Sequence, residues 1–228
     1  MIEFLFLDLD DTILDFHKAE RLAIAKTFRE FGLEPTDAVL NRYHEINKLH
    51  WQRLERGEIT RDQVLVGRFQ MLFDELGKHA DPAQIARSYE HNLSIGHYYL
   101  PGAREAVDAL QGHYRLFLAS NGTASVQHSR LTSAGLYPCF EQVFVSQDLG
   151  FNKPAKEFFD ACAARIPGYD ADKAMMVGDS LTSDILGGIH GGMQTCWVNP
   201  AHKQAPENIR PDYEIESLSQ LPALLRKL

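Results

Sequence analysis

The sequence predicts an α/β protein: a doubly wound, Rossmann-like parallel sheet that carries an inserted α-helical cap subdomain. Two observations lead to this prediction, namely short apolar runs that end in polar or acidic residues, and helix-period stretches between the later runs. Runs this brief and continuous fit strands that are buried on both faces, as in a parallel sheet. The predicted strands are residues 4–7, 116–119, 143–145, 174–177 and 195–198.

Helical patterns connect the later strands. Residues 106–110 and residues 126–134 each follow the spacing of one helical face, and Gly112 and Gly135 come after them, where helices commonly end. This alternation of strand and helix is typical of a sheet with helices packed on both faces.

Residues 16–99 break the alternation, because they carry helix signals and no convincing strand. A capping-box pattern at Thr60 and Gln63 opens one long apolar stripe, and Gly77 is placed to end it. We expect this insertion to act as a lid over the acidic cluster that precedes it. The predicted organisation is an α/β core domain of residues 1–15 and 100–228 and an α-helical cap subdomain of residues 16–99.

Composition excludes several classes of protein. The apolar content of 44% and the charged content of 24% are those of a soluble globular domain. The net charge of -8 and the lack of a long Lys/Arg block argue against nucleic acid and against an anionic membrane surface as partners. An anionic substrate would therefore need a bound cation to reverse the local field.

The chain has three cysteines, Cys139, Cys162 and Cys196, which are far apart and show no CxxC spacing. They indicate neither a disulfide framework nor a zinc site, and we expect them to be small buried residues. The N-terminus lacks the pattern of a secretory signal, and no apolar stretch approaches the roughly 20 residues that span a bilayer. These features predict a cytoplasmic location.

Three carboxylates, Asp8, Asp10 and Asp11, follow the first predicted strand. Residues two apart in an extended chain point to the same side, so Asp8 and Asp10 can converge at the strand end, where open α/β sheets bind ligands. A solvated turn is the plain alternative, since Asp is common where strands end. A calcium loop does not fit, because it needs Gly and Glu where this chain has Ile13 and Ala19.

A second acidic motif follows the predicted strand at residues 174–177 and contains Asp179 and Asp184. Carboxylate oxygens from two strand ends describe a Mg²⁺ site better than the alternatives, and the scattered histidines show no transition-metal spacing. A divalent cation would also explain why like charges gather after the first strand.

Two further segments carry groups suited to an anion. Ser120 offers a hydroxyl ahead of the backbone N–H groups of Asn121 and Gly122, and Lys153 places an ammonium just before Pro154. Taken singly, the first is an ordinary turn and the second a solvated loop. The four motifs in this order, each after an apolar run, instead indicate a single site.

With these motifs, the chain resembles the haloacid dehalogenase superfamily, and specifically its phosphatase branch. The motifs match as residues 8–12 (DLDDT), Ser120, Lys153 with Pro154, and residues 178–184, and the resemblance spans essentially the whole chain. The helical insertion resembles the helical cap of the first type in that family.

Part of the sequence also resembles the pyrimidine 5′-nucleotidases, which hydrolyse modified nucleoside monophosphates. The similar segments are residues 46–59 of the insertion, residues 184–190 and residues 196–199. The resemblance implies a Mg²⁺-dependent phosphomonoester hydrolase whose substrate is a small phosphate ester, in particular a pyrimidine nucleoside 5′-monophosphate. Monomer and homodimer both stay open.

The resemblance also implies roles for the first two carboxylates. Asp8 would attack phosphorus and form an aspartyl-phosphate intermediate. Asp10 would protonate the leaving alkoxide and then take a proton from the attacking water. Dehalogenation is disfavoured, because carbon–halogen cleavage needs no leaving-group proton and dehalogenases lack an acid two residues after the nucleophile.

A ligand set for the cation follows from the same resemblance. Mg²⁺ would be held by Asp8, by the backbone carbonyl of Asp10 and by Asp179, with Asp184 fixing the ligands or the metal's waters. The groups expected to hold the phosphoryl oxygens are Ser120, Lys153 and the backbone near Asn121.

Two other functions remain as alternatives. A sugar phosphatase or phosphomutase would use the same scaffold, and a phosphoacceptor signalling module has a similar acidic pocket but carries its acceptor Asp on a later strand.

In the insertion, the side chains that could contact a substrate are Trp51, Arg53, Arg56 and Arg68. Trp51 and Phe69 lie on helical stripes, so we expect packing roles for them.

Overall fold

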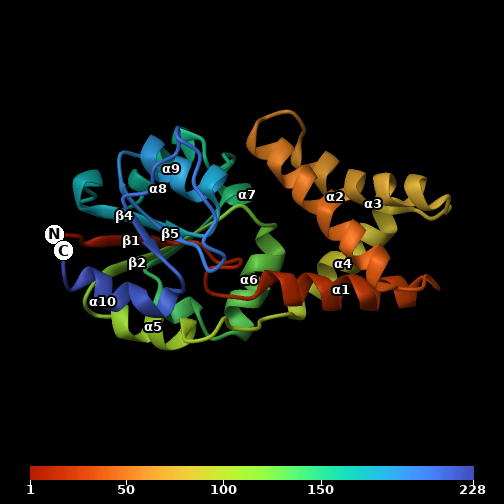
Figure 1. Cartoon of the computed structure of the whole chain (residues 1–228), viewed down its shortest axis with the longest axis horizontal. Coiled ribbons are helices and arrows are strands. Elements are labelled where there is room, and N and C mark those ends of the chain that lie inside the picture. Colours follow the sequence, from red (N-terminus) through yellow and green to blue (C-terminus); the bar gives the residue numbers. More distant parts are fainter. The chain divides into compact units, whose positions relative to one another are not determined.

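The computed structural model describes residues 1–228, which divide into two compact units. One unit, here called the α/β unit, contains Met1–Phe16 and His97–Leu228. The other, the helical unit, contains His17–Gly96. Figure 1 shows strands only in the α/β unit.

A six-stranded sheet forms the centre of the α/β unit, with the strand order β3-β2-β1-β4-β5-β6. Every neighbouring pair is parallel, so the predicted doubly wound fold class is confirmed. The five predicted runs are β1 to β5, whereas β6 was not predicted, because three residues at a sheet edge are too few to form a pattern. The strands are β1 (Phe4–Leu7), β2 (Arg115–Ser120), β3 (Gln142–Val145), β4 (Ala174–Gly178), β5 (Gln194–Val198) and β6 (Tyr213–Ile215).

Helices cover both faces of the sheet (Figure 1). In β1, Leu5 and Leu7 point to one face and join the core under α5, α6 and α10, while Phe4 and Phe6 point to the other and pack with α8. This two-residue alternation with both faces buried explains why the strand is apolar at every position. The helices of the unit are α5 (Ala103–Leu110), α6 (Ala124–Ser133), α7 (Ser146–Leu149), α8 (Lys156–Ala163), α9 (Leu186–His190) and α10 (Leu221–Leu225).

Short helical turns complete the α/β unit. Three are 3₁₀ turns, and one, η3, is a π-helical segment directly after β4 that contains Asp184. The turns are η1 (Tyr137–Cys139), η2 (Ala171–Lys173), η3 (Leu181–Ile185) and η4 (Leu218–Gln220).

Four helices form the helical unit, and an aromatic cluster lies at their centre. The rings of Tyr43, Phe69 and Tyr89 are 5.2 to 5.6 Å apart between centroids, which confirms the packing role expected for Phe69. None of the helices combines the length and the apolar character needed to cross a bilayer. The helices are α1 (Phe16–Glu30), α2 (Asp37–Glu55), α3 (Arg61–Leu76) and α4 (Pro82–Ile95).

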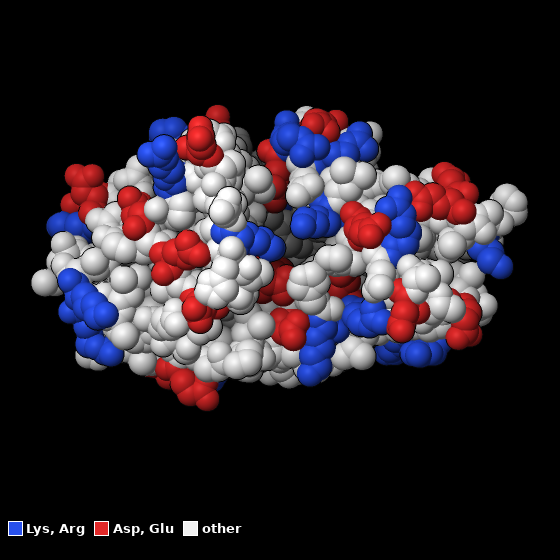
Figure 2. All heavy atoms as spheres, viewed as in Figure 1, with Lys and Arg blue, Asp and Glu red and all other residues white.

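Charged side chains of the two signs are interspersed on the face shown in Figure 2. Exposed charged side chains of the helical unit form ion pairs, as in the contact of 2.7 Å between Arg42 Nη2 and Glu75 Oε1. Exposed pairs of this kind contribute little to stability and mainly keep the surface polar.

The sequence signals at the ends of α3 are confirmed. Thr60 Oγ1 accepts a hydrogen bond from the Gln63 backbone at 3.3 Å, and Gln63 Oε1 accepts one from the Thr60 backbone at 2.8 Å. Gly77 ends the helix with a φ of 60°, a left-handed conformation that favours glycine. The capping box therefore satisfies two backbone donors that the first turn would otherwise leave unpaired.

Replacing the capping residue should weaken the helical unit. We expect Thr60→Ala to lower the free energy of unfolding by about 1 kcal/mol, because a backbone donor loses its acceptor. Chemical denaturation followed by circular dichroism measures this change. Gln70→Ala, at an exposed position inside the same helix, is the control and should change little; equal losses in both variants would contradict the capping role.

Candidate active site

The candidate site lies at the carboxyl end of β1. The backbone N–H of Asp8 donates to the carbonyl oxygen of Val177 at 2.9 Å, so the pairing of β1 with β4 continues one residue past the strand. This register fixes the backbone of Asp8 next to the end of β4. The side chain is buried, and the residue is 7% exposed.

Lys153 joins the two acidic motifs. Its Nζ atom donates to Asp8 Oδ1 at 2.7 Å, to Asp184 Oδ1 at 2.6 Å and to the Ala119 carbonyl oxygen at 2.6 Å. An ammonium has three donors, and all three are used. Burial alone lowers the pKa of Lys153, but the charges of Asp184 and Asp8 outweigh it and raise that pKa above its ordinary value. The lysine is therefore a buried, fully charged cross-link between the carboxylates.

Asn121 positions the lysine through its backbone. Asn121 Nδ2 donates to the Lys153 carbonyl oxygen, and Asn121 Oδ1 accepts from the Lys153 backbone N–H, both at 2.8 Å. The peptide between Lys153 and Pro154 is cis. The backbone near Asn121 was predicted to hold the phosphate, and the Asn121 side chain holds the loop that carries the ammonium.

Asp184 reaches the site from η3, the π-helical segment. Its Oδ2 atom accepts from the Ser180 backbone at 3.0 Å, while its Oδ1 atom is held by Lys153. A Cβ atom at Gly178 would lie 2.2 Å from Asp184 Oδ2, which is far inside the contact distance. Only glycine at this position lets the carboxylate pack against the end of β4.

The carboxylates of Asp8, Asp179 and Asp184 form one cluster, in which an oxygen of each lies within 4.8 Å of the others. Burial is the main cause that raises the pKa of Asp8 to about 8, with Lys153 opposing it and Asp184 adding to it. Burial and the charges of Asp184 and Asp8 also raise the pKa of Asp179 well above its ordinary value. One ammonium does not balance three carboxylates, so the cluster fits a divalent cation with oxygen ligands, such as Mg²⁺.

Asp10 lies apart from this cluster and is held by helix α6. Its Oδ1 atom accepts from Arg130 Nη1, and its Oδ2 atom accepts from Gln127 Nε2 at 2.7 Å. Gln127 Nε2 also donates to Ser120 Oγ at 2.8 Å, which links two of the predicted site residues directly. Gln127 was not predicted as a site residue, and Arg130 was predicted only as part of a helix pattern. The sequence did contain a signal for these two residues, since Gln127 and Arg130 share the helical face of Val126 and Leu131, where apolar side chains are expected.

The third carboxylate of the first motif has a local role. Asp11 Oδ1 accepts from the Phe16 backbone at 2.9 Å, and Asp11 has a φ of 56°, which Asp tolerates better than most residues. Asp11 therefore shapes the turn that leads into α1.

Two candidate substrate residues of the insertion have structural contacts instead. Arg68 is 2% exposed, donates to Asn47 Oδ1 at 2.8 Å and lies over the rings of Phe69 and Tyr89, so it is a core residue of the helical unit. Trp51 is half-buried rather than part of the core as expected, and the Arg61 guanidinium lies 5.6 Å from its ring centroid.

The other two candidates, Arg53 and Arg56, both pair with Glu58. Arg53 Nε lies 3.4 Å from Glu58 Oε2, and Arg56 is exposed. Their role in substrate contact stays a prediction.

A second group of side chains of the types that can bind metals, namely His17, Glu20 and His44, comes together in the helical unit. The sequence spacing did not suggest it, because His44 is on a different helix from the other two. Glu20 is buried, and its two oxygens already lie 2.6 Å from His44 Nδ1 and from Asn47 Nδ2. We interpret this group as a polar cluster that joins α1 to α2.

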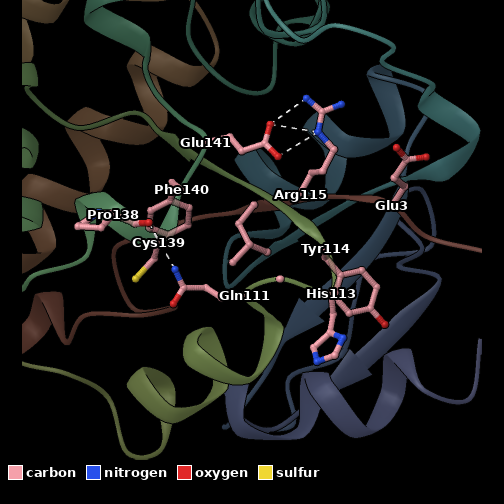
Figure 3. A pocket seen from close by; sticks show the side chains of 11 residues that line it. Glu3, Gln111, His113, Tyr114, Arg115, Pro138, Cys139, Phe140 and Glu141 are labelled. Atoms are coloured by element: carbon pink, nitrogen blue, oxygen red, sulfur yellow. Dashed lines mark hydrogen bonds and ion pairs between the residues drawn. The ribbon is translucent and has the colours of Figure 1, made fainter.

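A hollow of about 460 Å³ opens at the amino-terminal ends of the strands, the edge of the sheet opposite to the acidic cluster. Figure 3 shows Arg115 and Glu141 pointing toward each other there, with Arg115 Nη2 2.8 Å from Glu141 Oε2. Gln111 donates to the Pro138 carbonyl oxygen at 3.4 Å. Arg115 and Glu141 of this hollow are thus engaged with each other, and the hollow contains none of the predicted site residues.

A parallel sheet whose carboxyl edge gathers buried carboxylates around one lysine defines a Rossmann-like enzyme with an acidic centre. The chain belongs to the haloacid dehalogenase-like hydrolase family, whose model matches residues 2–192, and this confirms the resemblance based on the four motifs. It is an enzyme, a hydrolase of that family.

Three relatives match nearly the whole chain. HAD-hydrolase YfnB of Bacillus subtilis is 41% identical over 97% of this chain and 94% of its own length. A crystal structure of YfnB bound to magnesium matches with a TM-score of 0.94 over 98% of both chains, at 40% identity. Pyrimidine 5′-nucleotidase PynA of Streptococcus pneumoniae is 36% identical, over 99% of this chain and 95% of its own. Pyrimidine 5′-nucleotidase YjjG of Escherichia coli is 31% identical, over 99% of this chain and 98% of its own.

Removing the buried ammonium should destabilise the α/β unit. We expect Lys153→Met to lower the free energy of unfolding by about 3–5 kcal/mol in the absence of divalent cations, because two buried carboxylates lose their partner. Urea denaturation with chelator present measures this loss.

Lys156→Met is the matched control for that variant. Lys156 lies three residues away, is exposed and pairs with Asp160 at the surface, so its loss should change little. Similar stability in the two variants would contradict the role of Lys153 as a buried cross-link.

Proposed function

We propose that this chain is a Mg²⁺-dependent phosphomonoesterase that hydrolyses nucleoside 5′-monophosphates, in particular those of pyrimidines, through an aspartyl-phosphate at Asp8. The observation that carries the proposal is the contact of Lys153 with both Asp8 and Asp184 at the carboxyl edge of the sheet. Positioning and charge neutralisation account for most of the catalysis of phosphoryl transfer, and this arrangement is built for both.

In the first step, a carboxylate oxygen of Asp8 attacks phosphorus, a bond from that oxygen to phosphorus forms, and the ester bond from phosphorus to the leaving oxygen breaks. Lys153 keeps the Asp8 side chain in one orientation through Oδ1. Ser120 is 1% exposed at the end of β2 and accepts a hydrogen bond from the Gly122 backbone at 3.1 Å. Its hydroxyl proton can then be donated to a phosphoryl oxygen.

Asp10 moves the protons. It gives a proton to the departing alkoxide in the first step, and in the second step it takes one from the water that attacks phosphorus. The second attack breaks the bond between Asp8 and phosphorus, which releases inorganic phosphate and restores the Asp8 carboxylate. The side chain of Asp10 keeps 26% of its surface exposed, as a group that must exchange protons requires.

The cation would be held by Asp8, Asp179 and the backbone carbonyl of Asp10, with Asp184 orienting the ligands. When bound, Mg²⁺ supplies positive charge that offsets the negative charge of the phosphoryl oxygens. The clustering of the Asp8, Asp179 and Asp184 carboxylates within 4.8 Å of one another supports this assignment. Burial, with the neighbouring carboxylates adding to it, raises the pKa of Asp8 and of Asp179, so a bound cation would stabilise their charged forms.

The substrate class is inferred from the relatives. Two of them are pyrimidine 5′-nucleotidases that match over nearly their full lengths, and the protein with the high structural similarity was crystallised with magnesium. We propose that residues 16–99 act as the cap domain that selects the leaving group, with residues 1–15 and 100–228 carrying the chemistry.

Activity should depend on Mg²⁺ and on Asp8. With Mg²⁺ present, we expect uridine and cytidine 5′-monophosphate to release free phosphate faster than sugar phosphates, and chelation or Asp8→Asn to reduce the rate by several orders of magnitude. A phosphate-release assay on a panel of nucleoside monophosphates and sugar phosphates measures these rates.

Asp172→Asn is the control, because Asp172 is exposed and lies in η2, before the amino-terminal end of β4, whereas Asp179 follows the carboxyl end of that strand. Rates that survive chelation would refute the metal, and full activity in Asp8→Asn would refute the nucleophile. Interconversion of sugar phosphate isomers without free phosphate would identify a phosphomutase, and a stable phosphoprotein without turnover would identify a signalling module.

Mg²⁺ should also stabilise the folded protein independently of turnover. At a concentration of about 100 times the dissociation constant, binding adds about 2.7 kcal/mol, which raises Tm by about 5–10 °C for a chain of this size. Thermal melting with and without Mg²⁺ measures the shift. The shift should be largely lost in Asp179→Asn and kept in Asp172→Asn; an equal shift in both would remove Asp179 from the ligand set.

A further inference from the structure

Helix α6 buries two long polar side chains that the proposed function does not use. Gln127 is 1% exposed and Arg130 is 0% exposed, and they lie three residues apart, on one face of the helix, together with the apolar Val126 and Leu131. Burying an amide and a guanidinium costs free energy unless each finds partners. Apolar side chains would fill the same positions without that cost. The hydrogen-bond partners of Gln127 and Arg130 therefore indicate the role of these two residues.

Those partners are site residues. Arg130 Nη1 donates to Asp10 Oδ1 and, at 2.9 Å, to Gln127 Oε1. Gln127 Nε2 donates to Asp10 Oδ2 at 2.7 Å and to Ser120 Oγ at 2.8 Å. Each carboxylate oxygen of Asp10 is thus held by a different residue of α6, and the amide of Gln127 connects Asp10 to Ser120.

The guanidinium also decides which way the amide of Gln127 points. Arg has donors only, so the amide must turn its oxygen to Arg130 and its NH₂ group to Asp10 and Ser120. Both amide hydrogens are then used. Ser120 Oγ accepts from Gln127 and from the Gly122 backbone, so the hydrogen of Ser120 is left to point elsewhere.

The backbone beneath the amide is adapted to this arrangement. A Cβ atom at Gly122 would lie 2.4 Å from Gln127 Nε2, so a larger residue would push the amide off both partners. The Arg130 guanidinium packs over the ring of Phe16, with its central carbon 5.9 Å from the ring centroid. Gln127 therefore packs against the backbone at Gly122, and Arg130 packs against the ring of Phe16.

We propose that Gln127 and Arg130 are positioning residues that fix the proton donor Asp10 and the hydroxyl of Ser120 in position relative to each other. Arg130 orients Asp10 both directly and through Gln127, so its main effect is on leaving-group protonation. Gln127 touches both groups, so it also affects how Ser120 is presented to the phosphate. The inference rests on the proposed function, in which Asp10 supplies the proton to the alkoxide.

Two substrates separate this role from a structural one. A nucleoside 5′-monophosphate releases an alkoxide that must be protonated, whereas 4-nitrophenyl phosphate releases a nitrophenolate that departs without a proton. We expect Arg130→Met to lower kcat/KM for uridine 5′-monophosphate by about 100-fold, the size of a lost general-acid contribution. For 4-nitrophenyl phosphate, kcat/KM should change little, because it reports only the steps up to departure of the leaving group.

The second step provides an independent signature. Asp10 also accepts the proton of the attacking water, so Arg130→Met should slow kcat for both substrates. With 4-nitrophenyl phosphate, a burst of nitrophenolate close to one per enzyme should precede a slow steady state, because the phosphorylated enzyme accumulates. A loss caused by general loosening of the fold would lower the burst instead.

Three comparisons complete the test. Arg226→Met, at an exposed arginine of the α/β unit, should behave as wild type with both substrates. In an Asp10→Asn background, Arg130→Met should cost nothing further with uridine 5′-monophosphate, because the group it positions is already gone. Arg130→Lys should recover part of the lost rate. If Arg130→Met does not fold, Gln127→Met should show the same preference for 4-nitrophenyl phosphate, with an added loss on both substrates.

Equal losses of kcat/KM on the two substrates, or a further loss in the Asp10→Asn background, would overturn the inference. These outcomes differ from failure of the proposed function. If Asp10→Asn itself shows no dependence on the leaving group, or Asp8→Asn stays active, the proposed mechanism is wrong. If both behave as proposed and Arg130→Met does not, only the positioning role is wrong.

Discussion

The ammonium of Lys153 sits between two buried carboxylates at the carboxyl edge of the sheet, and much of the α/β unit serves to keep it there. Burying charge is costly unless each charge has a partner at short range. The loop before α8 must therefore deliver the ammonium to within hydrogen-bonding distance of both Asp8 and Asp184. Asn121 clamps that loop from the end of β2, so three strand ends take part in one charge balance.

The same constraint explains features that look unfavourable for stability. A glycine at position 178 gives up side-chain packing in a central strand, but it lets the Asp184 carboxylate approach the backbone. The π-helical turn between β4 and α9 departs from regular helix geometry, and it carries Asp184, whose Oδ1 atom accepts from the lysine. Local irregularity of this kind is common where a site needs a particular geometry. The cluster still carries more negative than positive charge, which leaves room for a cation and an anionic substrate together.

Helix α6 shows how polar groups outside the motifs extend the site. Gln127 and Arg130 occupy positions that a helix packed on a sheet normally fills with apolar residues. They hold Asp10, and the amide of Gln127 also donates to Ser120. The first two carboxylates of the first motif therefore have different cationic partners, because Asp8 pairs with Lys153 and Asp10 pairs with Arg130. Two carboxylates two residues apart thus have different surroundings, as different chemical roles require.

The sequence by itself determined the five long strands, the helical insertion, the capping box of α3 and the candidate residues of the site. These follow from local patterns: apolar runs, helical spacing, and side chains placed where strands end. It did not reveal β6, the partly exposed Trp51, the burial of Arg68 or the polar face of α6. Only the tertiary structure decided these, because each depends on which distant segment packs against which. Asp8 and Lys153 are far apart in the chain, and their contact exists only when the parallel strands are in register.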